Sequence, residues 1–244
     1  MKNDSSDGSA GRGQPIFLLP GEVSILAMLL IVIYVAFEFA LDHDGQLWLW
    51  LWFGMIPSRF VDPDIVGGML PLLWTPITHA LLHGSWTHLL FNVVWLAIFG
   101  TPVARRYGRM WFYLVFFAGA IGGALFFSVL QIDQGSVLIG ASGGIASLTG
   151  AAMRFVFEPV EMGTDLESGR TIVMGRRLAS MAGVFRNARA RAFTLFWLGF
   201  NLAIPAYEAM VVSEGPSIAW QAHIGGFVVG FLLPSLIEGG RGRR

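Results

Sequence analysis

The sequence predicts an all-α polytopic membrane protein in which six helices cross the bilayer. Three observations predict this fold class: the composition, the long apolar segments and the placement of the basic residues. Of the 244 residues, 55% are apolar and only 13% are charged, and the mean hydropathy is +0.63. Soluble domains carry about 25% charged residues, so the composition disfavours an ordinary soluble enzyme.

The charge balance and the absence of cysteine restrict the chemistry further. Sixteen basic residues are matched by sixteen acidic residues, which excludes the strongly basic balance of nucleic-acid-binding proteins. We therefore expect no nucleic-acid partner. The chain contains no cysteine, so neither a disulfide nor a thiolate metal site can form.

Six segments are apolar enough to be transmembrane helices, each of which needs about 20 residues. The first contains no charge from Val23 to Phe37. The fourth is short and begins in a glycine-rich sequence, so we expect it to lie inside the protein rather than against lipid. The predicted spans are residues 23–41, 86–104, 110–131, 142–157, 193–212 and 219–237.

The basic residues test this count independently. With six crossings, fifteen of the sixteen Lys and Arg residues fall on one side and only Arg59 falls on the other. The positive-inside rule then places both termini and the loop 158–191 in the cytoplasm. We expect residues 1–20 to form a disordered cytoplasmic tail, residues 21–238 the membrane domain, and residues 239–244 a basic cytoplasmic C-terminus.

The segment between the first two spans has a distinct pattern. From Leu47 to Phe53 the chain alternates Leu and Trp before ending in Phe, and this apolar run is too short to cross the bilayer. Tryptophan is enriched at headgroup depth. We therefore predict an interfacial helical loop over residues 42–85, which places the bilayer itself among the partners.

Polar side chains inside spans are costly, so each is a candidate functional group. At 1.5 Å per residue, four of them lie within roughly 10 Å of the outer membrane surface, on three different helices. These four are His88, Asn92, Ser142 and His223. The others are Glu38, Asn201 and Glu208, for which we expect interhelical hydrogen bonds or contact with water.

The four groups at one depth fit acyl-transfer chemistry. A serine hydroxyl becomes an effective nucleophile when a neighbouring base accepts its proton, and His223 is the candidate base for Ser142. The oxyanion that forms needs preorganised donors; the candidates are the backbone N–H of Ser142 and the side chains of His88 and Asn92. No carboxylate lies at this level, so the residues allow a dyad and no triad.

Three motifs resemble those of the rhomboid family of intramembrane serine proteases. The run from His79 through His83, His88 and Asn92 resembles the His-x-x-x-His and His-x-x-x-Asn pattern of the second span. The other two motifs are Gly140-Ala141-Ser142-Gly143, which resembles the nucleophile motif, and Ala222-His223-x-x-Gly226-x-x-x-Gly230, which resembles that of the last span. The resemblance covers about residues 23–237.

The resemblance implies a six-helix rhomboid bundle that hydrolyses peptide bonds in or near transmembrane segments of other membrane proteins. It implies Ser142 as nucleophile, His223 as general base, and an oxyanion hole of His88, Asn92 and the Ser142 backbone. It implies that neither a metal nor a cofactor takes part. It further implies a site that is open to the outer side of the membrane and a location in a bacterial inner membrane. The oligomeric state stays open. Two positions depart from common family patterns: Thr75 follows Trp74, and Ala146 lies four residues after the serine.

Other interpretations remain open at this point. The chain could be a non-catalytic rhomboid-like protein that binds transmembrane helices. A transporter using Glu38, His88, Asn92 and His223 is less well supported, because these groups cluster at one level instead of forming a path. His79 and His83 are four residues apart and could bind a metal, although a structural role in the outer loop is favoured.

Overall fold

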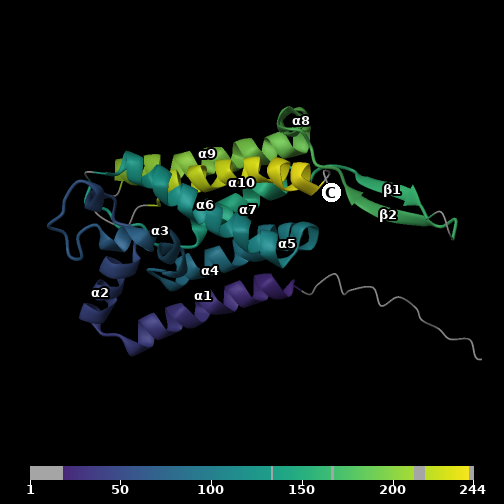
Figure 1. Ribbon diagram of the computed structural model, residues 1–244. Helices are drawn as coiled ribbons and strands as arrows, with labels where there is room; N and C mark the ends of the chain where they lie inside the picture. Colours follow the sequence, from purple (N-terminus) through teal and green to yellow (C-terminus); the bar gives the residue numbers. More distant parts are fainter. Residues whose placement is uncertain (1–18, 133, 166–167, 212–217, 242–244) are drawn as a thin grey trace, which may run out of the picture.

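The computed structural model describes residues 19–132, 134–165, 168–211 and 218–241. The predicted tail 1–20 therefore lies almost entirely outside the described residues, as does the end of segment 239–244. Within the described part the chain is mostly helical, and its long helices run side by side (Figure 1).

Each of the six predicted segments coincides with helix in the structure. Between α4 and α5 the helix continues through a π-helical turn at Leu96–Gly100. The fourth segment, α7, is shorter than predicted because the chain turns at Arg154 instead of continuing to residue 157. The helices are α1 (Gly21–Ala40), α4 (Trp86–Trp95), α5 (Thr101–Tyr107), α6 (Arg109–Leu130), α7 (Ser142–Met153), α9 (Ala188–Val211) and α10 (Trp220–Arg241).

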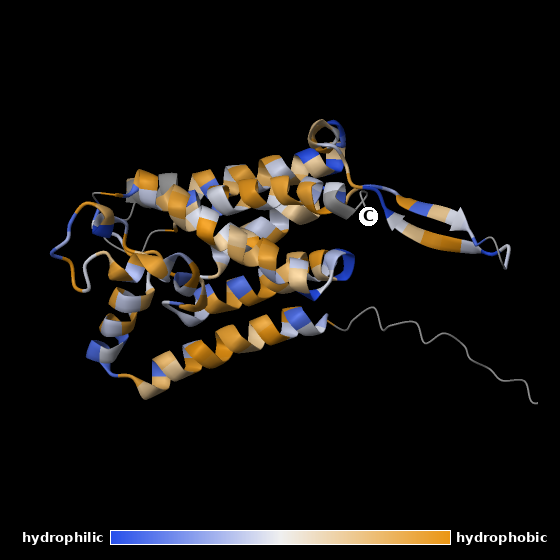
Figure 2. Ribbon diagram, viewed as in Figure 1, coloured by the Kyte–Doolittle hydropathy of each residue, from blue (hydrophilic) through white to orange (hydrophobic). Residues whose placement is uncertain are grey.

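Three stretches of the described chain are both long and apolar enough to cross a membrane. They are Gly21–Ala40, Trp86–Leu130 and Trp220–Gly239. The helix α1 exposes large apolar side chains, among them Met28 at 60% and Phe39 at 76% of their surface, and it is coloured hydrophobic along most of its length (Figure 2). Such an exposed apolar surface is suited to lipid, since soluble proteins rarely expose one of this extent.

The helix α7 forms the centre of the bundle and is buried from Gly143 to Met153. It packs against α6 and α10 through small residues that let the backbones approach closely. A methyl group on Gly230 would overlap the carbonyl oxygen of Ser147, and one on Gly123 would lie 2.5 Å from the carbonyl oxygen of Ala222. The three helices therefore have little freedom to shift against one another.

The prediction that the chain is all-α is wrong in the loop 158–191. Two antiparallel strands, β1 (Val160–Thr164) and β2 (Thr171–Arg176), form a hairpin that projects beyond the bundle (Figure 1). A short helix, α8 (Met181–Arg186), follows it. The strands are rich in Val, Ile and Thr, which favour extended backbone.

The loop between α1 and α4 contains helix, as predicted. The helix α2 (His43–Phe53) runs across the end of the bundle (Figure 1) and is followed by α3 (Thr75–Thr78). Single 3₁₀ turns occupy Pro57–Phe60, Leu70–Leu73 and His79–Leu81. The depth of the loop between α1 and α4 in a membrane stays a prediction.

Three side chains hold the end of α2 in place. The last carbonyls of a helix lack partners within it, and here three consecutive ones accept hydrogen bonds from the loop. Arg59 Nη2 donates to the Leu51 oxygen at 2.6 Å. Trp74 Nε1 and Thr78 Oγ1 donate to the next two carbonyls, at 2.7 and 2.8 Å. The buried Arg59 also donates to the Val66 oxygen at 2.8 Å, so it ties the loop to itself.

Candidate active site

The first residue of α7 is Ser142, the predicted nucleophile. The chain reaches it through Gly140, whose φ of +119° is a conformation that other residues rarely adopt. The Gly140 amide donates to the His79 carbonyl at 2.9 Å, which fixes this turn against the loop before α4. The hydroxyl of Ser142 is thus presented at the amino end of a rigid, buried helix.

The His88 side chain lies directly over this turn. A Cβ atom on Gly140 would be only 2.7 Å from Cε1 and Nε2 of His88, and 3.8 Å from Oγ of Ser142. The imidazole therefore occupies the space that any other side chain at position 140 would need. His88 and Ser142 thus both lie beside Gly140, and the absence of a side chain at this position leaves room for the imidazole.

The helix α4 holds His88 by a conventional cap. The Ser85 hydroxyl accepts a hydrogen bond from the His88 backbone N–H at 3.1 Å, as an N-cap residue does. One turn further along, the buried Asn92 donates through Nδ2 to the His88 carbonyl at 3.1 Å. An amide nitrogen carries two hydrogens, so Asn92 retains a second one that it can donate.

The predicted base, His223, lies in the first turn of α10. This turn is packed against the start of α7, because a methyl group on Gly226 would overlap the Gly143 carbonyl oxygen. The His223 ring binds a side chain from a third helix: its Nδ1 lies 2.5 Å from Oδ1 of Asn201 on α9. Ser142 and His223 are thus carried by two helix ends in direct backbone contact.

This contact of Asn201 is more specific than the sequence indicated. The sequence predicted that Asn201 makes an interhelical hydrogen bond or faces water, and the structure shows the hydrogen bond. Nothing in the sequence named His223 as its partner. The other two polar residues differ. Glu38 accepts from Tyr34 within α1 at 3.2 Å, and the side chain of Glu208 lies outside the described residues.

The two histidines before α4 are buried in the outer loop. His79 Nδ1 is 2.8 Å from the Thr75 carbonyl oxygen, so this nitrogen carries the proton. The His83 ring meets the His88 ring edge to face, with centroids 5.0 Å apart. Burial lowers the pKa of His79 to about 4 and, with the charge of His88, that of His83 to about 3. Both rings are therefore neutral at pH 7.

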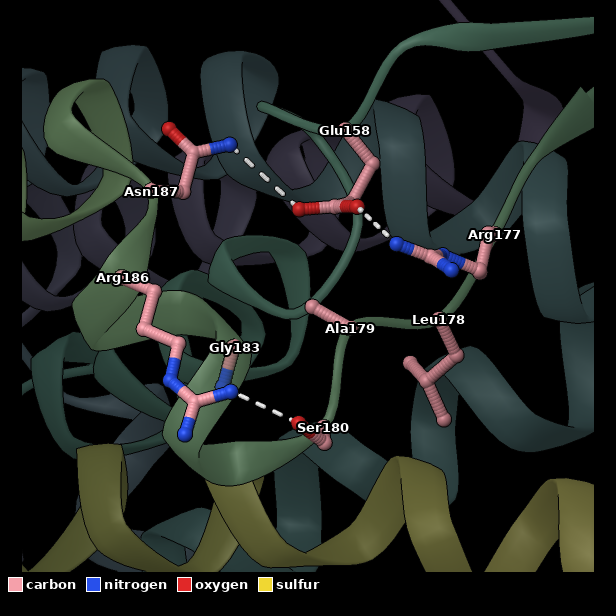
Figure 3. Close-up of a pocket in the computed structure, with 8 residues that line it drawn as sticks. All are labelled: Glu158, Arg177, Leu178, Ala179, Ser180, Gly183, Arg186 and Asn187. Atoms are coloured by element: carbon pink, nitrogen blue, oxygen red, sulfur yellow. Dashed lines mark hydrogen bonds and ion pairs between the residues drawn. The ribbon is translucent and has the colours of Figure 1, made fainter.

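A cavity of about 560 Å³ lies near the other end of α7, beside the hairpin and α8. Figure 3 shows that Glu158, in its lining, binds both Arg177 and Asn187. Glu158 accepts from Arg177 at 3.5 Å and from Asn187 at 3.3 Å. Since α7 is 12 residues long, it separates this cavity from Ser142 by roughly 18 Å. The cavity is therefore distinct from the candidate site.

Comparison with known proteins gives a consistent assignment. The family model of the rhomboid domain matches residues 71–238. This range includes Ser142 and His223, and also His88 and Asn92 on α4. The chain belongs to the rhomboid family. It is thus an integral membrane protein of a family that includes intramembrane proteases.

Several curated relatives share moderate identity with this rhomboid chain. The rhomboid protease GlpG of Photorhabdus laumondii is 26% identical over 218 residues, which are 87% of this chain and 60% of that protein. The mitochondrial RHOMBOID-like protein 12 of Arabidopsis thaliana is 26% identical over 181 residues, 70% of this chain and 48% of the relative. The human Rhomboid-related protein 3 is 29% identical over 162 residues, 66% of this chain and 35% of the relative. The chain spans between about a third and three fifths of these relatives.

Proposed function

We propose that this rhomboid is an intramembrane serine endopeptidase that uses a Ser142–His223 dyad. The observation that carries the proposal is the assembly at the amino end of α7. The His88 imidazole and the Ser142 hydroxyl both lie within 4 Å of the point that a Cβ atom on Gly140 would occupy. The first turn of α10, which carries His223, packs against the same helix end. A relative named as a protease supports this chemistry.

The residues supply each group that acyl transfer requires. His223 accepts the hydroxyl proton of Ser142 while Oγ attacks the peptide carbonyl. The developing oxyanion is stabilised by the backbone N–H of Ser142, at a helix amino end where donors lack partners within the helix. His88 and Asn92 on α4 supply two further donors. The protonated His223 then gives its proton to the leaving amine as the C–N bond breaks. In the second half, His223 takes a proton from the water that attacks the acyl ester and returns it to Ser142 Oγ as the acid leaves.

The proposed topology follows from the charges. Six crossings place fifteen of sixteen basic residues on the cytoplasmic side, together with both termini. The amino ends of α7 and α10 then face the outer side, where water reaches the site. Transmembrane segments of other proteins are the proposed substrates, and a bacterial inner membrane is the proposed location.

Cleavage in proteoliposomes tests this function. The purified chain is reconstituted with a fluorescent model protein that has one transmembrane helix, beside the variants Ser142→Ala and His223→Ala. We expect product from wild type only, with both variants folded and inserted in the bilayer. Product from Ser142→Ala at the wild-type rate would overturn the proposal. Binding of the model substrate without cleavage by wild type would instead indicate a non-catalytic rhomboid that binds helices.

A further inference from the structure

The hydrogen bond between α9 and α10 has a chemical consequence for His223. Nδ1 of His223 lies 2.5 Å from Oδ1 of Asn201, and the Asn201 side chain is 6% exposed. A short hydrogen bond between the buried Asn201 and the half-buried His223, which lie on different helices, fixes both side chains.

The orientation of the Asn201 amide follows from its second contact. Nδ2 of Asn201 donates to the carbonyl oxygen of Trp197, one turn earlier, at 2.8 Å. Exchanging the amide oxygen and nitrogen would place two oxygens against each other at this position. Oδ1 therefore faces His223, and because an amide oxygen only accepts, Nδ1 must carry the hydrogen.

The proton on Nδ1 leaves the other ring nitrogen free. A neutral imidazole has one N–H and one lone pair, so Nε2 of His223 is the nitrogen that can accept a proton. A base that takes the hydroxyl proton of Ser142 needs this tautomer. When that proton arrives on Nε2, the N–H on Nδ1 stays bonded to Asn201, so the ring does not rotate during the transfer.

Packing around the pair keeps it aligned. The rings of Trp197 and Phe227 stack with their centroids 4.6 Å apart. Trp197 lies one turn before Asn201 on α9, and Phe227 lies one turn after His223 on α10. The position four residues after the serine is the buried Ala146, whose methyl group cannot stack on a ring. In the described part of the chain, the contact that orients the His223 ring is therefore the amide on α9.

We propose that Asn201 is a positioning residue for this site, which holds His223 as the Nδ1–H tautomer with Nε2 ready to accept the Ser142 proton. This inference rests on the proposed dyad. Asn201 itself touches neither substrate nor the reacting atoms, and as a neutral amide it adds no charge to the site.

The test compares two substitutions on α9 that keep the size of the side chain. Asn201→Leu removes the acceptor of His223, while Thr194→Val replaces another buried polar residue that makes no side-chain hydrogen bond in the described structure. The first readout is the rate of labelling by a fluorophosphonate in detergent. The second is the ¹⁵N spectrum of the His223 ring, which reports the tautomer independently of activity.

We expect Asn201→Leu to label about 10- to 100-fold more slowly, which is less than the roughly 100- to 10,000-fold loss that follows complete removal of base catalysis. Thr194→Val should stay within a few-fold of wild type. The wild-type spectrum should show the Nδ1–H tautomer, and Asn201→Leu should populate the Nε2–H form.

A wild-type ring protonated at Nε2 would overturn the inference even if Asn201→Leu did not fold. Labelling of Asn201→Leu at the wild-type rate, while Ser142→Ala does not label, would overturn it with the dyad intact. Wild-type protein whose labelling does not depend on Ser142 would instead refute the proposed function, and the spectrum would still decide the tautomer.

Discussion

The contact between α7 and α10 predicts a large effect from one methyl group. Gly226 faces the carbonyl oxygen of Gly143, and a Cβ atom added there would overlap that oxygen. The carbonyl is part of the backbone, so it cannot rotate away. Non-bonded carbon and oxygen atoms stay about 3.3 Å apart, so Gly226→Ala must separate the two helix ends by about 1 Å.

This separation acts on the proposed catalytic pair, because Gly143 follows Ser142 directly and Gly226 lies one turn after His223. A misplacement of about 1 Å can reduce a reaction rate roughly 100-fold, and overpacking a core costs about 1–3 kcal/mol of stability. We therefore expect Gly226→Ala to label with a fluorophosphonate about 100-fold more slowly than wild type, and to unfold at a lower temperature.

The matched control is Gly199→Ala on α9. A methyl group there meets nothing within 4 Å, so labelling should equal that of wild type. The unfolding temperature should be equal or slightly higher, because alanine favours helix over glycine. Each protein is labelled over time in the same detergent and followed by gel fluorescence. A Gly226→Ala protein that labels within threefold of wild type would refute the reasoning that close backbone packing sets the geometry of this site.

Three further predictions follow from individual contacts. Gly140→Ala should abolish labelling, because its Cβ would lie 2.7 Å from the His88 ring and its φ of +119° disfavours alanine; labelling at more than a tenth of the wild-type rate would contradict this. Arg59→Met leaves the carbonyls of Leu51 in α2 and of Val66 in the loop without their buried donor, which costs about 1–3 kcal/mol each. Limited proteolysis should therefore cut the loop between α2 and α3 faster while the membrane helices stay intact, and an unchanged cleavage rate would count against this anchor. The pKa values of His79 and His83 are lowered to about 4 and about 3, so as the pH falls the unfolded chain, whose histidines have a pKa of 6.5, binds protons before the folded chain does. The unfolding temperature should therefore be highest above pH 6.5 and fall towards pH 4. His79→Asn should show a shallower fall, and an equal slope would contradict the prediction.

The sequence predicted the helices well because lipid imposes strong and simple rules. An apolar run such as Val23 to Phe37 has few alternatives to helix in a bilayer, since its backbone must satisfy its own hydrogen bonds. The location of Ser142 at a helix start was likewise visible in its flanking glycines. Composition and spacing were therefore sufficient to predict helices at these places and to group four polar residues at one depth.

The missed features depend on contacts between distant parts of the chain. The loop is anchored by Arg59 and Trp74, which donate to carbonyls at the end of α2. Every residue has a backbone carbonyl, so no sequence pattern indicates which carbonyls will accept a hydrogen bond from a side chain. Sequence placed Asn201 in an apolar helix, but only the packing of α9 against α10 pairs it with His223.

The hairpin of β1 and β2 was missed for a different reason. Its strands lie outside the proposed spans, where the bilayer no longer restricts the backbone to helix. There the Val, Ile and Thr residues favour extended backbone, as they do in soluble proteins. Its exposed apolar side chains include Met162, Val173 and Met174.

The most direct test of the account is the site of fluorophosphonate modification on the purified protein. We predict that mass spectrometry finds a single adduct on Ser142 in wild type, that Ser142→Ala carries none, and that His223→Ala labels at least 100-fold more slowly. An adduct on another serine, or equal labelling of wild type and His223→Ala, would contradict the proposal that His223 activates Ser142.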